Sequence, residues 1–504
     1  MARHSQPSLK ITESSLFLMG STGLTAGLGY CFWILVGHAY TPQRVGLATS
    51  LINTISLISY LSLFGFNSVL IRHQAKGPAR NRQLTISLLI TAVGGLVFGN
   101  LFLALLPWIS PKLLFIRQDR WYAFFFVAFC TFAAVNLLTD SVFMAARLPQ
   151  YNLLVDGVVQ SLSKLAMPIF LVTFGAVGIV ASTGVGFAAA VIASLIAMYV
   201  VLGFRPEFKF GGTRLREQAR YSLASYGSAL LNLLPQLVLP LLALARLGSE
   251  AEAYYFMAFQ IANMVYTASH SIGDATFSEA SHDISRLGEA LRRSAKLNLI
   301  VLVPAVAILT VGGGLVLSLF GQVYAQHARG LLVLLVAGAF AVALNNWSSN
   351  ALRVVGRMRA FVVSNVFFAV VSIGMAAATA SRGLIWVGAA WVAGNFVSGI
   401  AALVCVPWHS TKKSAEAPAV RTPAPAPFGM EDTVPMVFPW VTPEGRRINS
   451  AKPPGRTRPP DLAGAGGPMD DALTEPLYLG GDMALRARAG DPRPRADKRS
   501  DSNW

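Results

Sequence analysis

Long apolar segments follow one another along the first 406 residues, separated by short polar segments that are mostly basic. A helix that crosses a bilayer needs about 20 mainly apolar residues, because the hydrocarbon core is about 30 Å thick and the helix rises about 1.5 Å per residue. About twelve segments meet this requirement, so the pattern predicts an all-α integral membrane protein. The predicted spans lie within residues 14–43, 45–71, 83–111, 121–139, 151–204 (two spans, divided near Gly175 and Gly178), 221–245, 253–273, 297–328, 330–352, 360–381 and 383–411.

The basic segment 205–220 divides the apolar region into two halves of six helices, 14–204 and 221–406. A weak internal repeat supports this division, because polar residues of span four recur in kind on span ten. The two sets are Asn136, Thr139, Asp140 and Arg147, and Asn346, Ser349, Asn350 and Arg357, with Gly65 and Gly273 as a further pair. Six helices per half make the two repeats parallel.

Lysines and arginines are unequally distributed between alternate connections, and this bias predicts the orientation. One side, with residues 1–13 and the 205–220 connector, collects 19 of them, and the other side only seven. The seven are Arg44, Lys112, Arg117, Arg120, Arg246, Arg329 and Arg382. We therefore expect both termini to be cytoplasmic and the protein to lie in the cytoplasmic (inner) membrane.

The composition agrees with a lipid environment, since 54% of the residues are hydrophobic and only 13% are charged. The formal net charge of +17 raises the question of nucleic acid. Residues 1–406 carry 27 basic and 12 acidic residues, so most of the excess lies in the connections between spans. Anionic membrane lipids account for it, and no nucleic-acid partner is expected.

Residues 407–504 have a different composition, with 16 Pro and 9 Gly among 98 residues. We expect this cytoplasmic tail to be disordered. Its apolar patch, residues 434–441, is a candidate contact for a cytosolic partner protein, although chance composition is the simpler explanation.

Span five carries Asn152, Asp156, Gln160 and Lys164 at intervals of four residues, which places them on one helix face. Polar groups inside a membrane face protein or a water-filled cavity. Two interpretations remain open: an internal Asp156–Lys164 link that packs two helices, or a cavity lining that contacts cargo.

Span eight places His270 and Asp274 one helical turn apart, and Asp140 lies near the end of span four. Such groups can bind a coupling proton or cation. A structural hydrogen bond between helices is the alternative.

Span seven contains two prolines five residues apart, Pro235 and Pro240, around Gln236, with Asn232 just before them. A proline removes a backbone hydrogen bond and kinks the helix. We predict that this span bends during gating and that Asn232 and Gln236 line the cavity, although membrane helices also tolerate prolines without a gating role.

Arg72, Arg147, Arg353 and Arg357 lie at the cytoplasmic ends of predicted spans. They are explained most simply as positive-inside anchors. Any that point inward are suited to a pyrophosphate group, because a guanidinium matches its oxygens bidentately.

The chain resembles the polysaccharide-biosynthesis flippases of the multidrug, oligosaccharidyl-lipid and polysaccharide exporter superfamily. The resemblance covers residues 14–406 and rests first on the two six-helix halves. Its sequence features are Phe64-Gly65 followed by Arg72 on span two, Ala-Arg147 and Gly356-Arg357 at the ends of spans four and ten, and the NLLPQLVLPLL run from Asn232. It implies two bundles that rock about a central cationic cavity, with a lipid-linked oligosaccharide as cargo and membrane lipids around it.

Three other functions compete with this one. A multidrug and toxin extrusion exporter would use an acidic cavity, for which Asp140, Asp156, Asp274 and Glu279 are available. A scaffold that has lost transport would recruit synthesis enzymes through the tail. A membrane enzyme is disfavoured, because the predicted outer connections are short and no catalytic motif is visible. We expect no cofactor, and the cysteine and histidine positions indicate no metal site.

Overall fold

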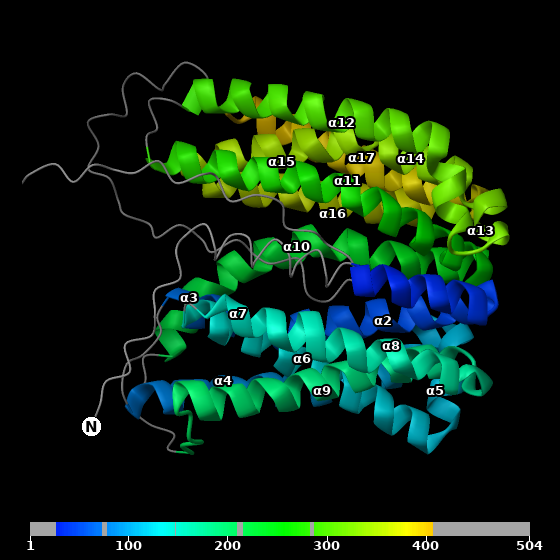
Figure 1. Cartoon of the computed structure of the whole chain (residues 1–504). Helices are drawn as coiled ribbons and strands as arrows, with labels where there is room; N and C mark the ends of the chain where they lie inside the picture. Colours follow the sequence, from blue (N-terminus) through cyan, green and yellow to red (C-terminus); the bar gives the residue numbers. More distant parts are fainter. Residues whose placement is uncertain (1–26, 73–77, 147, 209–214, 283–286, 407–504) are drawn as a thin grey trace, which may run out of the picture. The chain divides into compact units, whose positions relative to one another are not determined.

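A computed structural model describes residues 27–72, 78–146, 148–208, 215–282 and 287–406. Within these ranges every regular element is a helix (Figure 1). All the described residues fall into one unit of the chain.

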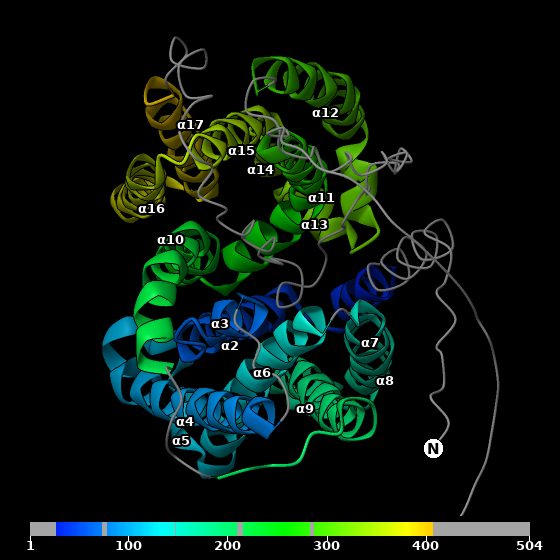
Figure 2. The same ribbon diagram turned by 90° about the vertical axis from the view of Figure 1, so that its left-hand side faces the viewer.

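The first half begins with an apolar helix described from Gly27 to Ala39. The elements that follow it are α2 (Pro42–Ser62), α3 (Phe66–Arg72), α4 (Pro78–Ile109), η1 (Pro111–Leu113), α5 (Phe115–Gln118), α6 (Arg120–Ala145), α7 (Pro149–Asn152), the π-helix η2 (Leu153–Gln160), α8 (Ser161–Phe170), η3 (Val172–Phe174) and α9 (Ala176–Leu202). Figure 2 shows α4, α6 and α9 side by side, in agreement with the contacts of α6 with both of the others.

The second half consists of α10 (Leu215–Leu247), α11 (Ser249–His282), α12 (Leu287–Ser318), α13 (Gln322–His327), α14 (Arg329–Ala337), α15 (Ala339–Val354), α16 (Met358–Thr379), η5 (Ala380–Arg382) and α17 (Leu384–Val404). Here α15, α16 and α17 pack together, and α11 packs on α15. The start of α10 at Leu215 places Arg216 and Arg220 in the helix rather than in the predicted connector.

Ten helical segments of the described chain are long and apolar enough to cross a membrane. Gly27–Ala39 and α11 supply the remaining two predicted spans, although the first is described only in part and α11 carries acidic residues in its first turn. The multi-pass helical fold is therefore confirmed.

Several predicted boundaries differ from the structure, two of them at turns. The predicted ninth span, 297–328, ends early: α12 stops at Ser318, and Gly321 turns the chain with a φ of 131° before α13. Gln43 belongs to the second helix rather than the first, because Pro42 occupies the first turn of α2, where its missing N–H leaves no hydrogen bond unmade.

The division of residues 151–204 into two spans is confirmed. Gly175 has a φ of 59°, which favours glycine, and it directly precedes α9. The segment before it tightens into the 3-10 helix η3.

Large apolar side chains are exposed along the helices at the outside of each half. Val97 of α4, Ile196 of α9, Val311 of α12 and Val370 of α16 are all more than half exposed. Water would disfavour so much exposed apolar surface, whereas lipid accommodates it. These faces therefore contact the membrane.

The second span is broken at Phe64 and Gly65, whose φ values are 47° and 81°. A left-handed conformation is costly for phenylalanine. Its ring, however, packs 5.6 Å from the ring of Phe98 and against Gly94 of α4. The step noted in the sequence is thus a turn between α2 and α3.

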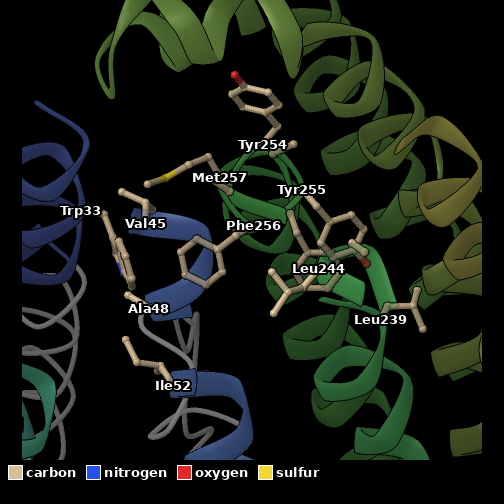
Figure 3. Close-up of a cluster of buried hydrophobic side chains, with 14 of the residues drawn as sticks. Trp33, Val45, Ala48, Ile52, Leu239, Leu244, Tyr254, Tyr255, Phe256 and Met257 are labelled. Atoms are coloured by element: carbon tan, nitrogen blue, oxygen red, sulfur yellow. The ribbon is translucent and has the colours of Figure 1, made fainter. Parts of the chain in front are cut away.

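The two halves touch where α2 and α11 begin. Val45 and Ala48 of α2 and Phe256 and Met257 of α11 belong to one buried apolar cluster (Figure 3). Trp33 of the first helix packs against Phe256, with ring centroids 4.5 Å apart and the ring planes tilted by 57°. We call the contact between residues 45–49 of α2 and 249–253 of α11 the α2–α11 seam.

Candidate functional site

A buried polar cluster lies within the first half, between α6 and the π-helix η2. Asn136 Nδ2 donates to Asp156 Oδ1 at 2.9 Å, and Asn152 Nδ2 donates to the backbone oxygen of Asp140 at 3.1 Å. The side chain of Asp156 also faces that of Asp140. Asp140 and Asp156, each less than a tenth exposed, are therefore brought together.

The π-helix explains how this cluster forms. It spans Leu153–Gln160 and so contains both Asp156 and Gln160. A π-helix inserts an extra residue into the turn, and such segments occur frequently at functional sites. The stripe predicted on an ideal α-helix is consequently divided: Asp156 faces α6, and Gln160 is buried close to Gly186 of α9.

Lys164 of α8 contacts the first helix. Its ammonium lies 5.6 Å from the ring centroid of Phe32 on the first helix, a cation–π contact. The charges of Lys164 and Asp156 still interact, while the hydrogen bond to Asp156 Oδ1 comes from Asn136. Taken as a whole residue, Lys164 is half-buried.

A second polar cluster lies in the other half, between the C-terminal part of α11 and α15. Asn346 Nδ2 donates to the backbone oxygen of Ser269 at 3.1 Å, and His270 faces Asn346. Asn350 Nδ2 donates to Asn346 Oδ1 at 3.2 Å. The predicted pair His270 and Asp274 therefore belongs to a larger group that includes the repeat residues of span ten.

Arg353 completes this second cluster. Its Nη1 donates to Asn350 Oδ1 at 2.9 Å, and its guanidinium lies 4.4 Å from the ring centroid of Phe277 and 5.9 Å from that of Phe361. Its charge interacts with that of Asp274. Arg353 is half-buried and Asp274 is exposed, so the charged face of the cluster is open on one side.

Arg357, by contrast, is exposed and donates from Nη1 to the backbone oxygen of Cys405 at 3.0 Å. It caps the end of α17, as expected for an anchor. Arg147 and the side chains of Arg72 and Glu279 lie outside the described part of the chain.

Span seven is an unbroken helix through Pro235 and Pro240, both of which are buried. Asn232 Nδ2 donates to Asn365 Oδ1 of α16 at 3.3 Å, and Gln236 is half-buried. Asn232 therefore helps to pack α10 on α16. The predicted gating by the two prolines stays a prediction.

The sequence reasoning missed one residue of the α2–α11 seam, Glu252. It began the eighth span at Ala253 because charges were taken to mark connections, but α11 begins at Ser249 and Glu252 is fully buried. The long apolar run that directly follows Glu252 is the sequence feature that could have indicated its burial. Glu252 lies only three residues after the start of α11.

Comparisons with solved structures identify the fold. The inward-closed lipid II flippase MurJ superposes with a TM-score of 0.64 at 10% identity, covering 77% of this chain and 87% of that one. An inward-facing multidrug resistance MATE family transporter of the MOP superfamily gives 0.59 at 18%, covering 79% and 96%. A MOP superfamily transporter from Pyrococcus furiosus Vc1 (DSM3638), whose title refers to the reverse polarity of its binding pocket, gives 0.55 at 19%, covering 79% and 95%.

These likenesses define a multi-helix membrane protein with the fold of the MOP superfamily transporters. No curated protein matches the sequence. The sequence profile described as polysaccharide biosynthesis protein matches residues 11–277, which is more than half of the chain. The chain belongs to the polysaccharide biosynthesis protein family.

Proposed function

We propose that this protein moves lipid-linked oligosaccharide precursors across the cytoplasmic membrane by alternating access, with both termini in the cytoplasm. The family assignment supports a role in polysaccharide biosynthesis, and the fold is similar to that of a lipid II flippase. No enzymatic step is part of the proposal.

The observation that carries the proposal is the placement of one basic group in each half. Lys164 lies beside the polar cluster of the first half, and Arg353 lies in that of the second. A charged group on a membrane helix is costly against lipid and is retained where it faces protein or water. The half-buried Arg353, beside the exposed Asp274, is thus suited to meet a charged ligand.

The chemistry of a pyrophosphate fits these groups. A guanidinium donates two parallel hydrogen bonds to phosphate oxygens, whereas an ammonium acts as a point charge. The rings of Phe277 and Phe361 hold the Arg353 guanidinium in place, which reduces the entropy lost on binding. We propose that Arg353 and Lys164 bind the phosphates and that the sugar chain occupies the space between the two polar clusters.

The test is a flipping assay in proteoliposomes that contain a fluorescent undecaprenyl-pyrophosphate oligosaccharide, with a membrane-impermeant quencher added outside. Arg353→Ala should lower the flipping rate at least about tenfold, since a lost charge-assisted bond is worth about 1.5–3 kcal/mol. Arg357→Ala is the matched control, because Arg357 is exposed and only caps α17. Equal rates for wild type and Arg353→Ala would contradict the assignment of Arg353.

The acidic residues favour one alternative, a cation exporter of the multidrug type. Asp140, Asp156 and Asp274 lie in the two clusters, and an acidic cavity attracts amphipathic cations. The same liposomes loaded with ethidium decide between the two. Ethidium transport without flipping of the lipid-linked sugar would replace the proposal.

A further inference from the structure

Glu252 is a buried carboxyl that the proposed cargo route does not use. It lies in the first turn of α11 and has no exposed surface. Thr49 of α2, from the other half of the protein, donates its hydroxyl to Glu252 Oε2, and Oε1 has no hydrogen-bond partner among the described residues.

The surroundings of Glu252 are hydroxyl groups rather than cations. Ser50 faces it from α2, Tyr255 from its own helix and Tyr324 from α13, and these three hydroxyls have no hydrogen-bond partner in the described structure. Both tyrosines are 1% exposed. Five charged or basic residues of other elements lie near this end of α11: Arg44, Lys112, Arg246, His327 and Arg329. These five residues and Glu250 are exposed. The buried surroundings therefore offer no counter-charge to an ionised carboxylate.

The proton arrangement at Thr49 favours a neutral Glu252. The Thr49 hydroxyl has one proton, yet the backbone oxygen of Val45 at 2.9 Å is within its reach as well as Glu252. If Glu252 carries a proton, it donates to Thr49, and Thr49 donates to Val45, so both groups are satisfied. If Glu252 is ionised, Thr49 has to give up Val45, and the fully buried charge is left with hydroxyl groups and without a cation.

The two halves approach each other closely near Glu252, which has no exposed surface. A Cβ atom built on Gly46 would lie 1.7 Å from the backbone oxygen of Ser249, and one on Gly37 of the first helix 2.3 Å from that of Phe320. The backbones of the two halves are therefore in direct contact at both glycines. Separation of these contacts would expose Glu252 to bulk water.

We infer that Glu252 is a proton-binding site that links the two halves of the protein. The neutral carboxyl keeps the α2–α11 seam closed, and loss of its proton opens the seam, because a buried unpaired charge is stabilised when water enters. The seam is therefore favoured at low pH and is lost as the pH rises. The charge bias of the sequence places this end of the helices on the extracytoplasmic side, so the proton would exchange there.

The test measures the distance between two spin labels by pulsed electron paramagnetic resonance in nanodiscs. The labels are placed on cysteines introduced at Gln118 and Gln326, which are exposed on different halves, in a chain whose three native cysteines have been replaced. In wild type, the population with the longer distance between the labels should increase relative to the population with the shorter distance between about pH 5 and about pH 9. The ratio of the two populations should change by at most about tenfold per pH unit, because a single proton is released. Glu252→Gln should keep the shorter distance at every pH.

Glu250→Gln is the matched control: Glu250 is exposed two residues earlier, and a glutamine there can still accept the hydrogen bond that Gln43 of α2 donates, so the pH response should be unchanged. A pH response that persists in Glu252→Gln, or that is absent from wild type, would overturn the inference. So would a change driven by sodium in place of potassium at constant pH, which would assign the site to a metal cation.

If Glu252→Gln cannot be purified, infrared difference spectra of the labelled wild-type chain supply the second measurement. Loss of the carbonyl band of a protonated buried carboxyl should follow the same pH midpoint as the distance change. A distance change without loss of that band would refute the inference. Neither measurement uses cargo, so their outcome is independent of the proposed function.

Discussion

Gly46 offers the sharpest test of the contact between the two halves. In Gly46→Ala the new Cβ atom would lie 1.7 Å from the Ser249 oxygen and 3.1 Å from the Ala253 nitrogen. Both are backbone atoms, so no side chain can rotate away. Ordinary contact begins at 3.4 Å, so α2 and α11 would have to move apart by about 1.7 Å.

This displacement should destabilise the closed seam by about 2–4 kcal/mol, which combines overpacking of a tight contact with loss of the Thr49–Glu252 hydrogen bond. The measurement is thermal unfolding of the purified protein, followed by its monodisperse fraction after heating. Gly46→Ala should melt clearly below wild type.

Gly374→Ala is the matched control, because a Cβ atom there meets nothing within 4 Å. Alanine should stabilise α16 by about 0.5–1 kcal/mol relative to glycine, so this variant should melt at or above wild type. If Gly46→Ala were as stable as Gly374→Ala, the close approach of α2 and α11 would be wrong.

Three further predictions concern orientation, gating and cargo. Single cysteines near Arg117 should react with an impermeant reagent from outside and those near Arg80 only from inside, and reversed labelling would refute the orientation. Replacing both Pro235 and Pro240 with alanine should leave thermal stability unchanged or raise it while reducing transport, and an unimpaired double variant in the flipping assay would remove their gating role. Lys164→Ala should reduce flipping about tenfold while the protein still purifies as a folded species, because Lys164 is half-buried and no hydrogen bond of Asp156 depends on it; unchanged flipping would exclude Lys164 from cargo binding.

The sequence by itself determined the helical membrane architecture. The lengths of the apolar segments give the number of spans, since the bilayer thickness sets the length of each. Gly175 divides spans five and six because its φ of 59° is a conformation that glycine adopts readily. The polar residues that matter were also visible, because charges inside apolar segments are rare.

Only the tertiary structure decided which of these residues meet. The π-helix turns Asp156 toward Asn136, and the periodicity of the sequence does not predict such an insertion. Arg353 and Arg357 differ by four residues in one basic cluster, yet one is held between two rings and the other caps a helix on the surface. The sequence places Glu252 at the end of a polar connection between two predicted spans. Its burial, however, depends on α2, a helix some 200 residues earlier. Sequence periodicity indicates only which residues share a face of one helix, so it could not predict this contact.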